Sequence, residues 1–289
     1  MTARRRARQG SSRGRGKRRR RTAARAAVRR TWVRLRRIWL RLQRAPPAAR
    51  LLVALLVLAT VAFAINGLYQ VLRKPTELFF PVSGELGKTP EDTWRAYESA
   101  FRRYATPSVT PELLAALAQV EGSGNPLVRT YWRWSWSARP FDLYRPASSA
   151  VGMYQITDGT FAEARHYCIH HHTLTREGPW NDWHACWFNS LYMRVVPRDA
   201  VELTAAYLDL KVNGILAELP HAAPTALERQ HLAAVVHLCG AGAAALYARH
   251  GFRFAAGQRC GDHDPREYVR RVDQMRAEFM RIAAHSDLQ

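Results

Sequence analysis

Glu121 has the setting that best suits acid–base chemistry in this sequence. It ends an apolar run, Leu113–Val120, and a turn sequence, GSGNP, follows at 122–126. Pro111 at the start of the run and glycines at its end predict a helix between them. A carboxyl group in apolar surroundings favours its protonated form, as a general acid near neutral pH requires. A Glu at a helix end is usually just solvated, so the rest of the sequence decides its meaning.

Three further sequence blocks follow the one that begins at Glu121. They are SAVGMYQITDGT at 149–160, VHLCGAG at 236–242 and REYV at 266–269. With EGSGNP at 121–126 they resemble the blocks E-S-x-x-N-P, G-A-x-G-L-M-Q-I-x-P-x-T, A-Y-N-A-G-P-G and E-T-x-x-Y-V. These belong to lytic transglycosylases of the soluble-lytic-transglycosylase (SLT) type, which are relatives of goose-type lysozyme. Four blocks in the right order, covering about residues 108–282, make the resemblance specific.

The resemblance implies a mostly α, lysozyme-like helical domain with the glycan in a cleft and Glu121 as the acid/base. Gln155 and the backbone at Met153 would contact the sugar, and Tyr268 would hydrogen-bond near the acid. Gly152 would allow the backbone to approach the ligand closely, and Gln155 offers both a donor and an acceptor. Gln155 as a buried structural amide is the alternative. The implied substrate-binding residues are Ser123, Ser149, Gly152, Met153, Tyr154, Gln155, His237 and Tyr268.

The sequence departs from the family pattern at two places that bear on the site. Gly122 stands where the family has Ser, and Ser123 follows one position later. His237 and Leu238 replace the usual Tyr-Asn pair. A sugar contact there is therefore lost or changed.

The implied reaction is cleavage of the MurNAc–GlcNAc β-1,4 bond of peptidoglycan, leaving 1,6-anhydroMurNAc ends, with Glu121 as the single acid/base and no cofactor. Glycosidases that act by hydrolysis normally use two carboxylates. Asp142 and Asp158 are the nearest candidates for a second one, although Asp158 suits a helix N-cap better. The alternatives are a muramidase hydrolase, or a non-catalytic glycan-binding scaffold of an envelope-spanning secretion or conjugation machine. An enzyme that clears murein for such a machine combines the two.

The charge of the chain is concentrated in its first 50 residues. The net charge is +21, yet residues 1–50 hold 20 Arg and Lys and no acid, so the remainder is almost neutral. Residues 51–72 carry no charge and are long enough for a membrane helix. The basic flank places the N-terminus in the cytoplasm and the rest of the chain outside. With the resemblance, this implies a single-pass protein of a bacterial inner membrane with a periplasmic catalytic domain. A signal peptide cleaved near Ala62-Phe63-Ala64 is the alternative.

The Arg-rich tail is predicted to be a solvated topology determinant that contacts anionic lipid. Trp32, Leu35, Trp39 and Leu42 have the spacing of an amphipathic helix on the inner leaflet. DNA or RNA binding by the tail is the less favoured alternative.

All four cysteines lie beyond the apolar segment, which predicts disulfides on the exported side. Cys168–Cys186 and Cys239–Cys260 are favoured because each pair closes a local loop, with the other two pairings left open. A zinc site recruiting His166, Cys168, His184 and Cys186 is disfavoured, because structural zinc usually shows tighter pairs. No metal is expected.

The predicted parts are the tail (1–50), the anchor (51–72), a linker and pre-domain helix (73–107) and the SLT-type domain (108–289). The linker proper is 73–90. Helices are expected at 93–104, from Pro111 to the glycines, from Thr160 to Cys168, and at 197–216, 224–239 and 265–284, and no run predicts a sheet. Trp132, Trp134 and Trp136 would share one face of an extended segment, either stacked on sugars or packed on the domain. Trp180, Trp183 and Trp187 are assigned to the core or the cleft wall.

Overall fold

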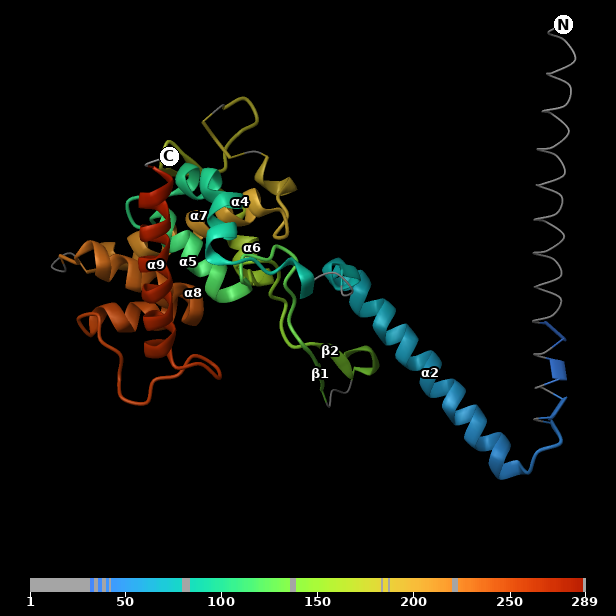
Figure 1. Ribbon diagram of the computed structural model, residues 1–289. Coiled ribbons are helices and arrows are strands. Elements are labelled where there is room, and N and C mark those ends of the chain that lie inside the picture. Colours follow the sequence, from blue (N-terminus) through green and yellow to red (C-terminus); the bar gives the residue numbers. More distant parts are fainter. Residues whose placement is uncertain are drawn as a thin grey trace, which may run out of the picture. The chain divides into compact units, whose positions relative to one another are not determined.

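The computed structural model describes residues 32–33, 36–37, 40–41, 43–79, 84–135, 139–182, 184–186, 188–219 and 223–287 (Figure 1). Its contacts divide the chain into two compact units, Met1–Ile65 and Asn66–Gln289, with the division inside one helix. The described chain is mostly helical, as predicted. Of the residues expected to form an amphipathic helix in the tail, only Trp32 is described, while Leu35, Trp39 and Leu42 lie outside the described residues.

Helix α2, Pro47–Arg73, contains the whole uncharged segment. Most of its leucines and valines are exposed, including Leu55, Leu58 and Val61, and it is long and apolar enough to cross a membrane. Helix α8, Ala226–Arg249, passes the same test of length and composition. However, α8 buries Leu232 and Val235 against other helices, so it is a core helix.

Helix α5, Pro111–Gly122, lies at the centre of the helical domain. The six residues 113–118 are all buried, so this helix is covered on every side. Helices α4 (Pro90–Tyr104), α7 (Pro197–Ala217) and α9 (Pro265–Ser286) pack against it, and α8 packs on α7 and α9 (Figure 1). Helix α4, which the sequence places ahead of the domain, supplies Trp94, Phe101 and Tyr104 to the same core.

The predicted ends of α5 agree with the structure. The Thr110 hydroxyl accepts a hydrogen bond from the backbone N–H of Leu113, with Pro111 in the first turn. At the other end Ser123 takes the left-handed conformation, with φ of 50°, and its N–H donates to the carbonyl of Gln119.

Two predictions about the segment after Gln155 are wrong. Thr157, and not Asp158, caps helix α6 (Asp158–Ala164), because the Thr157 hydroxyl accepts the N–H of Thr160. The helix ends at Ala164 instead of continuing to Cys168. Strand β3 (Tyr167–His170) follows and pairs with β4 (Thr173–Arg176).

Strands β1 (Trp132–Trp134) and β2 (Tyr144–Pro146) form a second antiparallel pair, so the expectation of no sheet is also wrong. Trp132 and Trp134 both contact the Tyr144 ring, at centroid distances of 5.2 and 4.9 Å. Their shared face is confirmed, while Trp136 lies outside the described residues. Short 3-10 turns are η1 (Pro75–Phe79), η2 (Gly84–Leu86), η3 (Pro140–Asp142) and η4 (Asn189–Leu191).

The two favoured disulfides, Cys168–Cys186 and Cys239–Cys260, are confirmed, with Cα–Cα distances of 5.6 and 5.2 Å. The first joins β3 to the loop after β4. The second lies beside a break in α8 at Gly240, where φ is 77°. The first part of α8 therefore ends at Cys239, as predicted.

Trp180 was expected in the core or the cleft wall, but its side chain is 83% exposed. It stands on the loop between β4 and Cys186, where no helix covers it. Trp183 and Trp187 lie outside the described residues.

Candidate functional site

Glu121 lies in the last turn of α5, where its side chain is 19% exposed. The hydroxyl of Tyr268, from the first turns of α9, donates a hydrogen bond to Glu121 Oε1 at 2.5 Å. Burial raises the pKa of Tyr268 well above its usual value, and the negative charge of Glu121 raises it further. Tyr268 therefore stays protonated and acts as a fixed donor to this carboxyl group.

His237, from α8, lies on the same side of the carboxyl group. Its Nε2 is 3.7 Å from Glu121 Oε1, and its side chain is 12% exposed. Burial lowers the pKa of His237, although the charge of Glu121 and a hydrogen bond with the backbone of Tyr154 oppose the effect. The imidazole is therefore neutral at pH 7.

The second oxygen of the carboxyl group has no hydrogen-bond partner within the described chain and is not fully buried. No described residue hydrogen-bonds to Glu121 Oε2, and this atom is not among the buried side-chain oxygens that lack a partner. One oxygen is thus held by the protein, and the other is free to exchange a proton with a bound molecule. This is the arrangement that a general acid/base requires.

Gly122 brings the first two sequence blocks into direct contact. A Cβ atom at this position would lie 2.8 Å from Met153 Cα and 2.9 Å from the Met153 carbonyl oxygen. The backbone of Met153 occupies the space that a side chain would need. Met153 is itself completely buried, so the backbone that was expected to contact a sugar packs against the protein. Glycine in place of the family's Ser is therefore a packing requirement, and it puts the Met153 backbone next to the acid.

The turn after Glu121 is held by residues that precede the domain in sequence. A Cβ on Gly124 would lie 2.2 Å from the Thr93 hydroxyl of α4. That hydroxyl donates to Gln119 Oε1 at 2.7 Å, and Lys88 Nζ donates to the Gly124 carbonyl at 3.2 Å. Sequence reasoning missed Thr93 because nothing local distinguishes it from an ordinary helix residue.

Ser123 contributes to this turn through its backbone. Its carbonyl accepts the N–H of Lys88 at 2.8 Å, and the residue is exposed. Within the described part of the chain its hydroxyl makes no hydrogen bond to Glu121, so it does not replace the expected Ser of the family.

Two residues of the second block contact other parts of the protein, although the resemblance implies that they contact the substrate. Gly152 has φ of +77°, and a Cβ there would lie 2.3 Å from the carbonyl oxygen of Arg194. The close backbone approach is therefore to Arg194. Tyr154 is fully buried, and its hydroxyl donates to the Leu114 carbonyl at 3.0 Å. Its side chain lies in the core and offers no surface to a substrate.

Gln155 and Ser149 are also engaged within the protein. Gln155 Nε2 donates to the carbonyl of Gly152 at 2.9 Å, and φ of Gln155 is 47°. The Ser149 hydroxyl accepts the N–H of Asp158 at 3.1 Å. Both side chains are partly exposed, so each keeps a polar surface while it shapes the loop.

Arg194 organises this loop, and no pattern in the sequence predicted its role. Its guanidinium donates to the carbonyls of Ser149 and Ile156, at 3.1 and 2.9 Å, and pairs with Asp158 at 2.9 Å. It lies in an irregular segment before α7, where no periodic pattern could have revealed it.

Neither candidate for a second carboxylate reaches Glu121. Asp158 is bound by Arg194, and Asp142 is buried and faces Arg73 at 3.7 Å. The described structure therefore presents Glu121 as the one carboxyl group among Met153, His237 and Tyr268.

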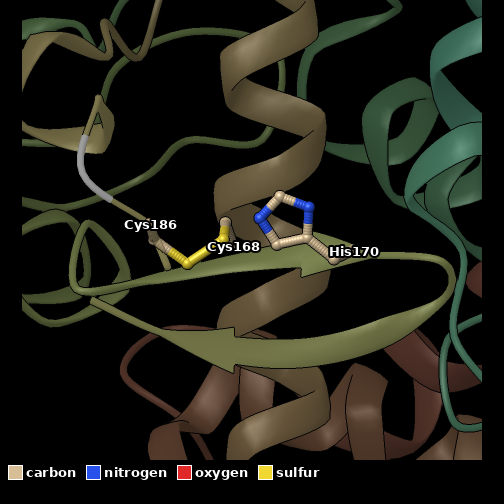
Figure 2. A group of neighbouring side chains, drawn as sticks. All are labelled: Cys168, His170 and Cys186. Atoms are coloured by element: carbon tan, nitrogen blue, oxygen red, sulfur yellow. A yellow bond between two sulfur atoms is a disulfide. The ribbon is translucent and has the colours of Figure 1, made fainter. Parts of the chain in front are cut away.

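Figure 2 shows His170 beside the disulfide between Cys168 and Cys186. The ligand atoms of these three residues lie within 4.8 Å of one another. A metal would need the two sulfurs as thiolates, and here they are bonded to each other. His170 is not part of the zinc set considered from the sequence. Of the two histidines in that set, His166 pairs with Glu177 at 2.7 Å, and His184 is exposed.

No family model matches this sequence, and no curated protein matches it.

The low pKa of His237 predicts a pH-dependent stability. The unfolded chain binds a proton on this residue near pH 6.5, whereas the folded chain binds it only at lower pH. Stability should therefore fall as the pH drops below about 6.5, because the unfolded state gains the proton first. His237→Gln should flatten that part of the profile. Urea unfolding of wild type and variant between pH 5 and 8 tests this, and parallel profiles would contradict it.

Proposed function

We propose that this protein is a membrane-anchored peptidoglycan lytic transglycosylase, with α2 in a bacterial inner membrane and the helical domain in the periplasm. The observation that carries the proposal is the convergence of separate sequence blocks on one carboxyl group. The imidazole of His237 and the hydroxyl of Tyr268 lie beside the Glu121 carboxyl group, and the backbone of Met153 packs against the adjacent Gly122. These are the blocks that carry the resemblance to SLT-type enzymes.

In the proposed reaction Glu121 Oε2 donates a proton to the oxygen that joins MurNAc to GlcNAc. The bond from that oxygen to the MurNAc anomeric carbon breaks, with the neighbouring acetamido group stabilising the positive charge. The Glu121 carboxylate then takes the proton of the MurNAc 6-hydroxyl, whose oxygen bonds to the anomeric carbon. The products are a new GlcNAc hydroxyl and a 1,6-anhydroMurNAc end, and Glu121 is again protonated.

The residues around the acid have matching tasks in this scheme. Tyr268 donates to Oε1, which leaves Oε2 for the substrate. His237 is neutral and therefore places no fixed positive charge beside an acid that must be protonated at the start of the reaction.

Mass spectrometry of murein digested by the full-length protein tests the proposal. Anhydro ends are one water lighter than the reducing ends that a hydrolase leaves, so the two activities are distinguished directly. Reducing ends would select a muramidase. Glycan binding without cleavage would select the non-catalytic scaffold of a secretion or conjugation machine.

Tyr268→Phe should lower kcat by about 10- to 100-fold, because a hydrogen bond to a charged group contributes about 1.5–3 kcal/mol. KM should change little, since the hydroxyl points at Glu121 and not at solvent. Tyr192→Phe is the matched control, because its hydroxyl donates to the carboxylate of Glu202 at 2.8 Å, away from Glu121. Equal losses of activity in the two variants would show that Tyr268 has only a structural role.

A further inference from the structure

The β1–β2 pair packs against the last two turns of α2. Asn66 Nδ2 donates to the Tyr144 carbonyl at 2.6 Å, and Gln70 Nε2 donates to the Phe141 carbonyl at 2.7 Å. The rings of Tyr69 and Phe141 are 5.4 Å apart. Asn66 and Gln70 are almost completely buried, so this is a built contact between helix and hairpin.

This contact falls within the uncharged part of α2. A membrane core needs about 20 apolar residues, and counting from Leu51 this length reaches Gln70. Asn66 and Gln70 are polar residues at the outer end of the stretch, and both use their amides to satisfy hairpin carbonyls, as backbone near the hydrocarbon requires. The hairpin therefore meets α2 where the helix would leave the bilayer.

The hairpin carries exposed aromatic and apolar side chains at this level. Tyr131 is 70% exposed and Trp134 is 69% exposed, and Phe141 and Leu143 are also exposed. Tyr69 and Leu72 of α2 are exposed beside them. Tyr and Trp are enriched where membrane proteins cross the headgroup region, and here they lie next to a helix of membrane-spanning length.

The other face of the hairpin carries positive charge. Arg133 and Arg145 lie directly opposite each other across the two strands. Like charges in this position destabilise a strand pair. No described residue forms an ion pair with either guanidinium. An anionic group between them would remove the repulsion, and lipid phosphate is the anion that membrane surfaces supply.

We propose that this surface, formed by Tyr69, Tyr131, Arg133, Trp134, Phe141, Leu143 and Arg145, lies in the headgroup layer of the membrane that α2 spans. Its aromatic side chains enter the interface, and Arg133 and Arg145 bind phospholipid phosphates. The inference rests on α2 being a membrane anchor, but not on the chemistry of Glu121. It would hold the domain in a fixed orientation at the membrane surface.

Tryptophan quenching in lipid nanodiscs tests this with the full-length protein. Brominated phosphatidylcholine quenches only indole rings that reach the bilayer. Trp134→Phe should lower the quenched fraction of the emission, because a membrane-inserted ring is lost. Trp180→Phe, the matched control, should raise that fraction, because an exposed ring outside the surface is lost. An unchanged or increased quenched fraction in Trp134→Phe would overturn the proposal.

The arginines are tested by charge reversal in discs that contain phosphatidylglycerol. Arg133→Glu with Arg145→Glu should lose the quenching that Trp134 contributes. Arg165→Glu with Arg253→Glu makes the same change of net charge at exposed sites elsewhere and should retain it. Retention in both double variants would show that Arg133 and Arg145 do not bind lipid phosphate.

Two further measurements distinguish failure of the membrane anchor from failure of the proposed headgroup surface. Extraction of the protein from membranes by alkaline carbonate would mean that α2 is not an anchor, which would remove the membrane attachment in the proposed function as well. Retention in the membrane without quenching of Trp134 would overturn the surface alone. In that case, a change in Trp134 emission on adding a soluble N-acetylglucosamine oligomer would identify the surface as a sugar site.

Discussion

Glu121→Gln should reduce murein cleavage by about 100- to 10,000-fold, the usual contribution of a general acid/base. The amide cannot release a proton at neutral pH, but it has the shape of the carboxyl group. Its oxygen can still accept the hydrogen bond of Tyr268, so the variant should fold as the wild type does. Release of anhydro-muropeptides from purified murein, measured with the melting temperature, gives both quantities.

Glu112→Gln is the matched control for this result. Glu112 lies in the first turn of the same helix, one residue after Pro111. The same substitution there should leave cleavage unchanged and alter stability only slightly, since a carboxylate near a helix N-terminus contributes about 0.3–1 kcal/mol. Near wild-type cleavage by Glu121→Gln would remove Glu121 from the proposed role, whatever Glu112→Gln does.

Gly122→Ser should destabilise the protein by about 2–3 kcal/mol, although Ser is the residue of the family pattern. The new Cβ would lie 2.8 Å from Met153 Cα and 2.9 Å from its carbonyl oxygen. Backbone cannot swing aside as a flexible side chain can, so the helix end and the Met153 loop must separate. The movement should also displace Glu121 and reduce cleavage. Thermal and urea unfolding of the full-length protein in detergent measure the stability.

Gly214→Ser separates this clash from the general effect of replacing a helical glycine. Gly214 lies inside α7, and no atom would come within 4 Å of a Cβ there. Ser has a higher helix propensity than Gly by a few tenths of a kcal/mol, so this control should be neutral or slightly more stable. A Gly122→Ser variant as stable as Gly214→Ser would show that the Met153 loop adapts freely.

Most helices were predictable because their signals are local. The charge-free stretch predicted α2, and Pro at the first turn marked the starts of α5 and α9. The disulfides were predictable for a related reason, since the paired cysteines are close in sequence. They are 18 residues apart in the first disulfide and 21 in the second. Short loops close at low entropic cost.

The β3–β4 hairpin was missed because its turn lacks the usual residues. His171 and His172 form the two-residue connection, and both have positive φ, of 48° and 63°. Such turns normally contain Asn or Gly, so two histidines give no signal. Tertiary contacts hold the strand that precedes the turn: Cys168 is bonded to Cys186, and the N–H of Ile169 donates to the buried Glu202 at 3.1 Å.

The sequence by itself determined where an acid stands at a helix end, which segment could cross a membrane, and which cysteine pairings are favoured. These depend on residue type, spacing and chain length, all of which can be read along the chain. Only the tertiary structure decided what surrounds Glu121. The partner that holds its oxygen, Tyr268, is 147 residues away, and the backbone against Gly122 belongs to another loop. Such contacts follow from how the helices pack on α5, because packing brings together residues that no local pattern relates.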